Sequence, residues 1–211
     1  GWVHAEYSLL PGSTDSRFRR ERRGAKGRTQ EIERLVARSL RAAVDLEELG
    51  PIALNVDCDI LNADGGTRCA SITAANLALR LGVRRLIAAG VCLPQNMRPN
   101  EEQRRSGWSA PVLSEDEQMA HEMRVMPHDV AAISVGLIDG KSYLDLDYNL
   151  DSNADVDMNV VKVSNGAFVE VQGTGEESTY QREELDALLD MADIGFSSLF
   201  EMQKTILHGQ E

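Results

Sequence analysis

Five consecutive residues, Asp64-Gly65-Gly66-Thr67-Arg68, combine the residue types that an anion-binding turn needs. The hydrophobic pattern predicts a buried strand before them and a helix after them, and the free backbone N–H groups at a helix N-terminus attract negative charge. Glycine lets the backbone approach a phosphate closely, while Thr67 adds a hydroxyl donor and Arg68 adds a planar guanidinium fork. An ordinary strand-to-helix turn is the alternative, because glycines are common at such turns.

A basic strip follows the first predicted strand, from Ser16 to Arg28, and holds seven Lys or Arg residues against one acidic residue. Closely spaced arginines in a loop suit a nucleic-acid phosphate backbone, and such binding weakens as salt rises. Phe18 is the one aromatic residue among them, so base stacking is a minor part of this interpretation. A solvated charged loop is the alternative. The basic residues are Arg17, Arg19, Arg20, Arg22, Arg23, Lys26 and Arg28.

Acidic residues gather farther along the chain and point to a third kind of chemistry. Asp155 and Asp157 lie on one face of a predicted strand, and Asp151 precedes them in a predicted turn. Converging carboxylates repel one another unless a hard cation joins them, and Mg²⁺ takes one or two carboxylates together with water and phosphate oxygens. A solvated acidic strand edge is the alternative. The full run is Asp145, Asp147, Asp151, Asp155 and Asp157.

The rest of the sequence excludes several classes of protein. No Cys–His pairing, G-x-S-x-G sequence, Walker A motif or zinc-ligand spacing is present, which argues against nucleophilic, P-loop and zinc chemistry. The three cysteines are odd in number and lie in apolar surroundings, so a reduced, cytoplasmic protein is predicted. No run of about 18 apolar residues is present, so no transmembrane helix is expected.

The net charge of −12 conceals an uneven distribution. Residues 1–50 contain ten basic and eight acidic residues, whereas residues 129–211 contain four basic and 17 acidic ones. An acidic protein with one concentrated basic strip can therefore still bind a polyanion along that strip.

All these residues depend on elements that the hydrophobic pattern places along 211 residues, a length typical of one domain or at most two. The order of the elements predicts an α+β or mixed α/β layer fold. Residues 91–128 hold four of the six prolines and four of the seven methionines, and we interpret them as a partly irregular insertion. Strands are expected over residues 2–10, 52–61, 130–138, 142–147, 156–163 and 168–172, and helices from 27 to the Gly50-Pro51 stop and over 69–89, 115–126 and 182–207.

Taken in order, these segments resemble the RNase PH family, bacterial phosphate-dependent 3′→5′ exoribonucleases that trim tRNA precursors. The resemblance covers nearly the whole chain apart from residues 91–128, and its motifs in this order are highly specific. It is carried by Gly1 to Pro11, Gly27 to Leu46, Val56 to Asp59, Ala63 to Thr73, Ala131 to Gly136, Leu144 to Leu146, Asp151-Ser152, Asp157 to Val161 and Phe168 to Thr174.

The resemblance implies an RNase PH-type α+β fold with mixed sheets packed against helices. It implies that residues 1–211 form a single domain with an atypical insertion at about 91–128, and that N-terminal strands of the family are missing. It also implies a homo-hexamer, a trimer of dimers. The insertion is expected either to disturb that ring or to cap the active site. A non-catalytic RNA-binding subunit of an exosome-like ring is the alternative function.

The same resemblance assigns roles to single residues. Inorganic phosphate, the co-substrate, would attack the last phosphodiester and release a nucleoside diphosphate, with no water and no covalent intermediate. The phosphate site falls on Arg28, Gly66, Thr67 and Arg68. The catalytic residues fall on Arg68, Asp151 and Asp157, and the two aspartates are expected to hold Mg²⁺ or Mn²⁺.

The family's tRNA-gripping arginines fall on Arg17 and Arg20. This chain has Gly12 where the family usually has another such arginine, and Arg19, Arg22 or Arg23 is the expected substitute. The implied partners are the 3′ ends of tRNA precursors and other RNA, including rRNA, and neither DNA nor a membrane is expected.

Overall fold

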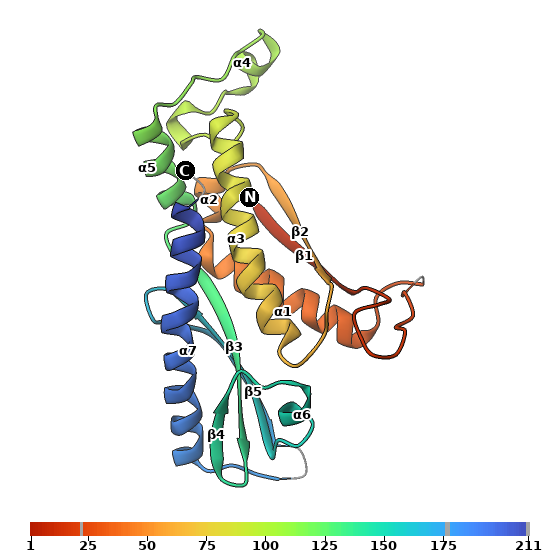
Figure 1. Cartoon of the computed structure of the whole chain (residues 1–211). Coiled ribbons are helices and arrows are strands. Elements are labelled where there is room, and N and C mark those ends of the chain that lie inside the picture. The colour runs from red at the N-terminus through yellow and green to blue at the C-terminus, as the bar shows by residue number, and fades with distance from the viewer. Residues whose placement is uncertain (22, 176–177, 210–211) are drawn as a thin grey trace.

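The structure is a computed structural model of the whole chain and describes residues 1–21, 23–175 and 178–209. Within these residues, a two-stranded parallel sheet and a four-stranded antiparallel sheet pack with helices (Figure 1). The strands are β1 (Trp2–Leu9), β2 (Ala53–Ile60), β3 (Val130–Ile138), β4 (Lys141–Leu144), β5 (Val156–Val163) and β6 (Phe168–Gly175). The helices are α1 (Gly27–Ala43), α2 (Leu46–Leu49), α3 (Thr67–Ala88), the 3-10 helix η1 (Gln95–Met97), α4 (Glu101–Arg105), α5 (Glu115–Val125), α6 (Tyr148–Asp151) and α7 (Arg182–His208).

The parallel pair β1 and β2 brings two helix N-termini to one end of a sheet. Both strands run in the same direction, with Ser8 opposite Asp59 near their carboxyl ends. The chain leaves β2 directly into α3 and leaves β1 through a long loop into α1. Because α1 runs back along β1, where Glu33 contacts Tyr7, its N-terminus also lies at this end. Ligand sites in α/β proteins favour such carboxyl ends of parallel strands.

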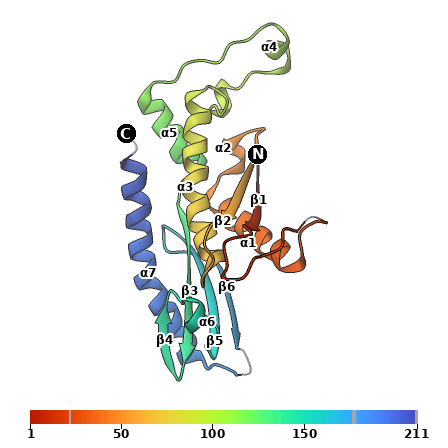
Figure 2. The same ribbon diagram turned by 45° about the vertical axis from the view of Figure 1, so that its right-hand side comes forward.

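The four-stranded sheet has the order β4-β3-β5-β6, and its two central strands are buried almost without interruption. Both faces are covered, as expected for continuous apolar strands. The long α7 lies on one face, and α3 and α1 contact the other (Figures 1 and 2). Along β3, Val130 and Ala132 pack with α1 and α3, whereas Ala131 and Ile133 pack under α7.

The helix α3 connects the two ends of the molecule. It is buried on most sides, and its 22 residues span on the order of 30 Å. Its N-terminus lies within the 64–68 turn, at Thr67, and the insertion begins at its other end, where α4 lies on an arm that projects from the body (Figure 2). A full helix length therefore separates the insertion from the 64–68 turn of the same chain.

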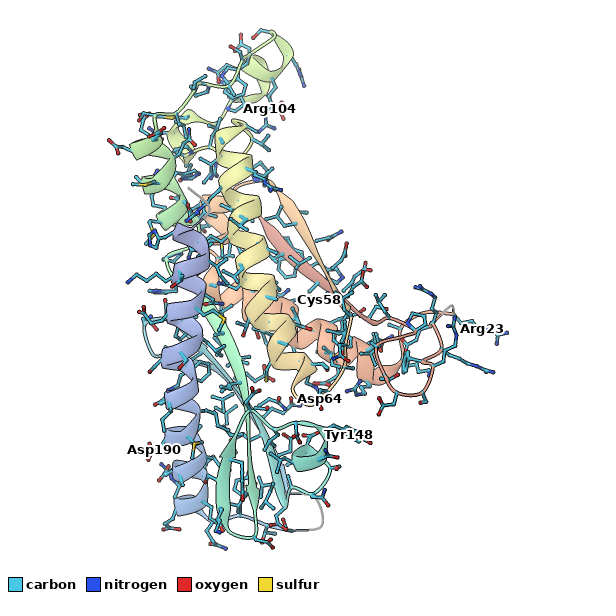
Figure 3. The ribbon with its side chains drawn as sticks, in the orientation of Figure 1. Arg23, Cys58, Asp64, Arg104, Tyr148 and Asp190 are labelled. Carbon is cyan, nitrogen blue, oxygen red and sulfur yellow. The ribbon has the colours of Figure 1, made fainter. Side chains whose placement is uncertain are left out.

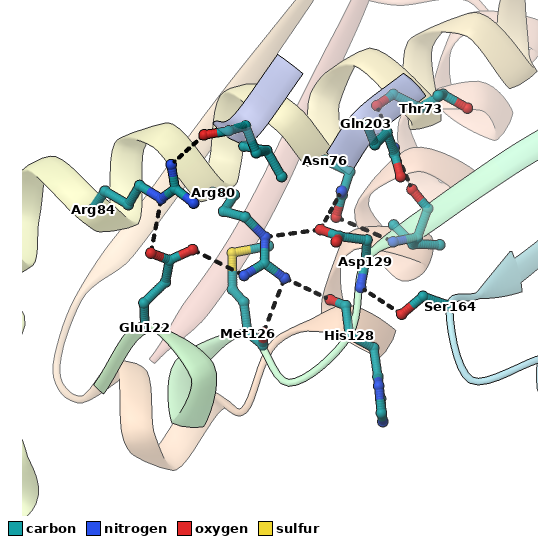
Figure 4. Close-up of polar contacts among 12 residues, drawn as sticks. Thr73, Asn76, Arg80, Arg84, Glu122, Met126, His128, Asp129, Ser164 and Gln203 are labelled. Carbon is teal, nitrogen blue, oxygen red and sulfur yellow. Dashed lines mark hydrogen bonds and ion pairs between the residues drawn. The ribbon is translucent and has the colours of Figure 1, made fainter. Parts of the chain in front are cut away.

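A buried polar network attaches the insertion to α3 (Figure 4). The Arg80 guanidinium pairs with Glu122 on α5 at 3.0 Å and with Asp129 at 2.8 Å. The second carboxylate oxygen of Glu122 pairs with Arg84 at 2.8 Å. Arg84 also donates to the carbonyl oxygen of Leu207 at 3.0 Å, so the C-terminal part of α7 joins the same network.

The predicted strands and long helices are present, with three local corrections. The helix that begins at Gly27 ends at Ala43, because Asp45 accepts hydrogen bonds from the backbone of residues 47 and 48 and starts α2 instead. The strand expected to reach residue 147 ends at Leu144, because Asp145 takes a positive φ of 55°. Asp151, expected in a turn, is the last residue of the short helix α6.

The three cysteines are all free thiols, and burial is the main cause that raises the pKa of Cys58 and of Cys92 to about 11. High thiol pKa values disfavour the reactive thiolate. Across residues 1–21, 23–175 and 178–209, no helix is both long enough and apolar enough to cross a bilayer.

Candidate functional site

The turn before α3 is clamped by the loop that follows β4. A Cβ on Gly65 would lie 1.9 Å from the carbonyl oxygen of Leu146, so another side chain fits only if the backbone moves. Gly66 has a φ of +69°, a left-handed conformation that favours glycine. Asp64 Oδ1 accepts hydrogen bonds from the backbone N–H groups of Gly65 (3.0 Å) and Tyr148 (2.6 Å). Figure 3 shows Asp64 and Tyr148 at this junction.

The first two residues of α3 contact both neighbouring elements. Thr67 Oγ1 lies 2.8 Å from the hydroxyl of Tyr7 on β1. Arg68 Nη2 donates to Glu31 Oε2 on α1 at 3.0 Å. The Nε–H of Arg68 is buried and has no hydrogen-bond partner among the described residues. Buried donors are nearly always paired, so an unpaired one beside a helix N-terminus favours the binding of an anion there.

The helix α1 brings Arg28 toward this place. Arg28 lies three residues before Glu31, so the two side chains project from neighbouring positions on the helix. Glu31 also accepts a hydrogen bond from Gln172 on β6 at 3.5 Å. Arg28 is exposed and lines a cavity of about 520 Å³ between β1, the basic strip and α1. The charged residues that line this cavity are Arg20, Lys26, Arg28, Glu6, Glu21 and Glu33.

The acidic run predicted from the sequence divides into two groups. Asp155 Oδ2 accepts a hydrogen bond from the backbone N–H of Asp139 at 2.9 Å, across the base of the β3–β4 turn. Asp147 Oδ1 accepts from the backbone N–H of Leu150 at 2.8 Å and caps α6. These two carboxylates therefore support local structure, and Asp145, Asp151 and Asp157 form the remaining group.

Two of the remaining carboxylates lie close to the first turn of α3. Burial is the main cause that raises the pKa of the Cys69 thiol well above its ordinary value, and Asp157 and Asp145 raise this pKa further, whereas Arg68 lowers it. The Cys69 thiol donates to Asn159 Oδ1 on β5 at 3.1 Å. The structure thus brings Asp157 on β5 and the Asp145 loop to the residues of the predicted phosphate turn.

A metal site is not evident from the carboxylates alone. In the part of the chain that the structure describes, no three or more His, Cys, Asp or Glu side chains are grouped closely enough to hold a metal ion. Asp151 and Asp157 are both partly buried. Mg²⁺ is often held by only one or two carboxylates, with water and substrate phosphate as the other ligands, and this mode needs no third protein carboxylate.

The basic strip lies in the long loop between β1 and α1. Arg17, Arg19 and Arg20 are exposed there, and Arg22 lies outside the described residues. Figure 3 shows Arg23 at the outer end of the loop, directed away from the body. Arg17 and Arg19 are therefore available to a large anionic partner, and Arg20 also lines the cavity beside Arg28.

Three hydrogen bonds fix the ends of this loop. The carbonyl oxygen of Ser13 accepts from the backbone N–H of Ala63 at 2.6 Å, so the loop starts beside the turn that leads to α3. Glu21 accepts from the backbone N–H of Lys26 at 2.9 Å and from the Thr29 hydroxyl at 3.2 Å, which joins the loop to the first turn of α1. The basic strip therefore extends outward from the end of the sheet where α1 and α3 begin.

Three residues of this site were not predicted from the sequence: Tyr7, Glu31 and Gln172. Glu31 could have been found, because it lies one turn after Arg28 on the same predicted helix. For Tyr7 and Gln172 the sequence carries no local signal, since only the tertiary fold brings Tyr7 to Thr67 and Gln172 to Glu31.

Comparison with known proteins gives the family. Two profiles match, the 3′ exoribonuclease family domain 1 over residues 1–82 and domain 2 over residues 128–195. A ribonuclease PH of Synechococcus sp. (strain CC9605) is 45% identical over 204 residues, which are 97% of this chain and 71% of that protein. A ribonuclease PH of Rhodopirellula baltica is 47% identical over 98% of this chain and 75% of its own length. This chain belongs to the RNase PH family. It is a phosphorolytic 3′→5′ exoribonuclease, an enzyme of the nucleotidyltransferase type.

Solved structures show the same RNase PH-type fold at low sequence identity. Rice Rrp46 superposes with a TM-score of 0.66 at 12% identity, over 98% of this chain and 73% of that one. A chain of the Archaeoglobus fulgidus exosome, solved with RNA bound to the active site, gives a TM-score of 0.59 at 19% identity, over 90% and 66% of the two chains. Residues 83–127, which include most of the insertion, lie between the two family matches.

Proposed function

We propose that this RNase PH chain shortens the 3′ ends of tRNA precursors, and of other RNA including rRNA, with inorganic phosphate bound at the N-terminus of α3. The observation that supports this is the meeting of three elements around Thr67 and Arg68. Helix α1 contributes Glu31 and, one turn earlier, Arg28, and β5 contributes Asp157. A helix N-terminus with a hydroxyl and a guanidinium suits a dianion.

In this reaction the residues position the phosphate and stabilise charge, and none of them forms a covalent bond to the substrate. A phosphate oxygen attacks the phosphorus of the last phosphodiester, and the new P–O bond forms as the bond to the preceding 3′ oxygen breaks. The 3′ oxygen leaves with the proton that the phosphate carried, and the product is a nucleoside diphosphate. Arg28, Thr67 and Arg68 hold the attacking group, and Arg68 stabilises the charge that spreads over the phosphoryl oxygens.

Asp151 and Asp157 are the residues that would hold Mg²⁺ or Mn²⁺. When bound, the ion neutralises charge on the phosphoryl oxygens. Asp157→Asn is expected to keep tRNA binding while turnover is lost on every substrate. Mn²⁺ titration followed by electron paramagnetic resonance in the presence of phosphate gives a readout independent of activity. If the Asp157→Asn chain binds Mn²⁺ as the parent does, the aspartate pair is not the metal site.

The basic strip is proposed to bind RNA away from the reacting bond, through Arg17, Arg19 and Arg20 and the neighbouring Arg22. The assembly proposed is a homo-hexamer built as a trimer of dimers, to be measured by light scattering of the purified chain. A cytoplasmic location is proposed because the three free thiols fit a reducing compartment.

The alternative function, a non-catalytic ring subunit, is disfavoured because phosphate-binding and acidic groups are kept together at one helix N-terminus.

One incubation separates the alternatives. The chain is incubated with a 3′-extended tRNA, with and without inorganic phosphate, and the released nucleotides are resolved by chromatography. Nucleoside diphosphates that appear only with phosphate support the proposal. Nucleoside monophosphates without phosphate would show hydrolysis, and tRNA binding without any release would favour the non-catalytic subunit.

A further inference from the structure

Tyr7 lies behind the proposed phosphate site and contacts Thr67, one of its ligands. We propose that Tyr7 is a positioning residue whose hydroxyl donates to Thr67 Oγ1 and thereby directs the Thr67 proton toward the attacking phosphate. This inference rests on the proposed phosphate site and adds a residue to it.

The geometry holds the Tyr7 hydroxyl in a fixed place beside Thr67. Its side chain projects inward from β1 into the core shared with α1 and α3, and the residue is only 4% exposed. Its hydroxyl oxygen lies 2.8 Å from Thr67 Oγ1. A buried aromatic ring has few rotamers, so a hydrogen bond from its end is held in one direction.

The count of donors decides which hydroxyl donates. Each hydroxyl has one hydrogen and two lone pairs. The unprotonated oxygens of a bound phosphate accept, so a Thr67 hydroxyl that contacts one of them donates its one hydrogen to it. The Thr67 oxygen then has only lone pairs left for Tyr7, and the Tyr7 hydroxyl becomes the donor of the 2.8 Å bond. Such a chain of hydroxyls also polarises the bond to the anion.

The helix itself does not orient the Thr67 hydroxyl. Inside a helix, a Ser or Thr hydroxyl usually bonds the carbonyl four residues earlier, and Ser71 does so here, with the carbonyl of Thr67 at 2.8 Å. Thr67 is the first residue of α3, so the carbonyl four residues before it belongs to the preceding turn and not to the helix. Orientation must therefore come from another element, and Tyr7 on β1 is the partner that the structure provides.

The test is a double-mutant cycle on the full chain, with Tyr7→Phe, Thr67→Val and the combination. Phosphorolysis of a short single-stranded oligonucleotide is followed as phosphate is varied, and Tyr143→Phe on β4 serves as the matched control. Tyr7→Phe is expected to raise the KM for phosphate about three- to tenfold, the effect of one hydrogen bond, with kcat within about twofold. Thr67→Val is expected to raise the KM for phosphate further. Adding Tyr7→Phe to Thr67→Val is expected to leave the KM of the Thr67→Val variant unchanged.

The outcomes separate this inference from the site on which it rests. If the double variant raises the KM for phosphate by the product of the two single effects, Tyr7 acts independently of Thr67 and the proposal is overturned. The same holds if Tyr7→Phe lowers kcat and leaves the KM for phosphate unchanged, because Tyr7 then acts on the fold. If the parent chain consumes phosphate and Tyr7→Phe behaves like Tyr143→Phe, the proposal also fails. If Thr67→Val leaves the KM for phosphate unchanged while the parent consumes phosphate, the proposed phosphate site itself is wrong.

Discussion

Glu122 is expected to hold the insertion on the core, and Glu122→Gln removes the charge that two arginines share. The Glu122 side chain is 9% exposed and pairs with Arg80, which is 5% exposed, and with Arg84, which is 32% exposed. The glutamine keeps the shape but leaves buried positive charge with less compensation, and breaking a buried ion pair costs about 3–5 kcal/mol. Arg80 keeps Asp129, and Arg84 is partly solvated, so we take the lower end, about 3 kcal/mol.

This loss is large enough to measure by thermal unfolding. A chain of this length shifts its Tm by about 2–4 °C per kcal/mol, so Glu122→Gln is expected to lower the Tm by about 6–12 °C. Circular dichroism at fixed pH and salt gives the value. Glu115→Gln, an exposed position on the same helix, is the control and is expected to change stability by less than about 0.5 kcal/mol.

The same variant tests whether the insertion acts on chemistry. The network lies toward the C-terminal end of α3, and the proposed phosphate site lies at its N-terminus. At 25 °C, Glu122→Gln is therefore expected to keep the parent's kcat and KM for phosphate on a short oligonucleotide. An unchanged Tm would refute the buried ion-pair argument, and a loss of kcat in a still-folded variant would refute the separation of the two ends.

Three further predictions concern the site and the surface. Gly65→Ala has no room for its methyl group and is expected to displace the turn and raise the KM for phosphate at least tenfold; parent-like phosphate kinetics would contradict this. Arg17→Ala with Arg20→Ala is expected to weaken tRNA binding and reduce the salt slope by about two, while the short oligonucleotide is still degraded; equal losses on both substrates would place the strip in the active site. Burial, and after it the charge of Arg124, lowers the pKa of His121, so the folded state favours the neutral imidazole. The free energy of unfolding is therefore expected to be highest above pH 6.5 and to fall as the solution is acidified. Unfolding midpoints between pH 7 and 5 check this, and His121→Gln should flatten the decline.

The sequence predicted the elements that have a long hydrophobic period and missed those that have none. The helices α3 and α7 and the strand β3 extend over many residues, so the apolar pattern identifies them. The short helices α2 and α4 have four and five residues, too few for a period, and each begins at a single capping side chain, Asp45 or Asn100. A capping residue is recognised by the backbone N–H groups that it bonds, and these are known only from the structure.

The candidate site follows the same division. Thr67 and Arg68 were predicted because they are contiguous with the glycine turn. The partners that orient them are distant, since Tyr7 lies 60 residues from Thr67 and Glu31 lies 37 residues from Arg68. Spacing also could not separate the five aspartates, because a carboxylate that caps a turn and one that faces the site look alike in sequence.

The position of the insertion explains how an RNase PH chain can accept it. The family matches stop at residue 82 and resume at 128, which brackets the C-terminal end of α3 and the start of β3. That end is the part of α3 farthest from Thr67, so added residues there do not displace the turn. The insertion also extends the core, because Cys92, Leu113 and Met126 are buried in the cluster formed by α1 and α3. Residues 91–128 therefore pack against one end of α3, and the turn before Thr67 lies at the other end.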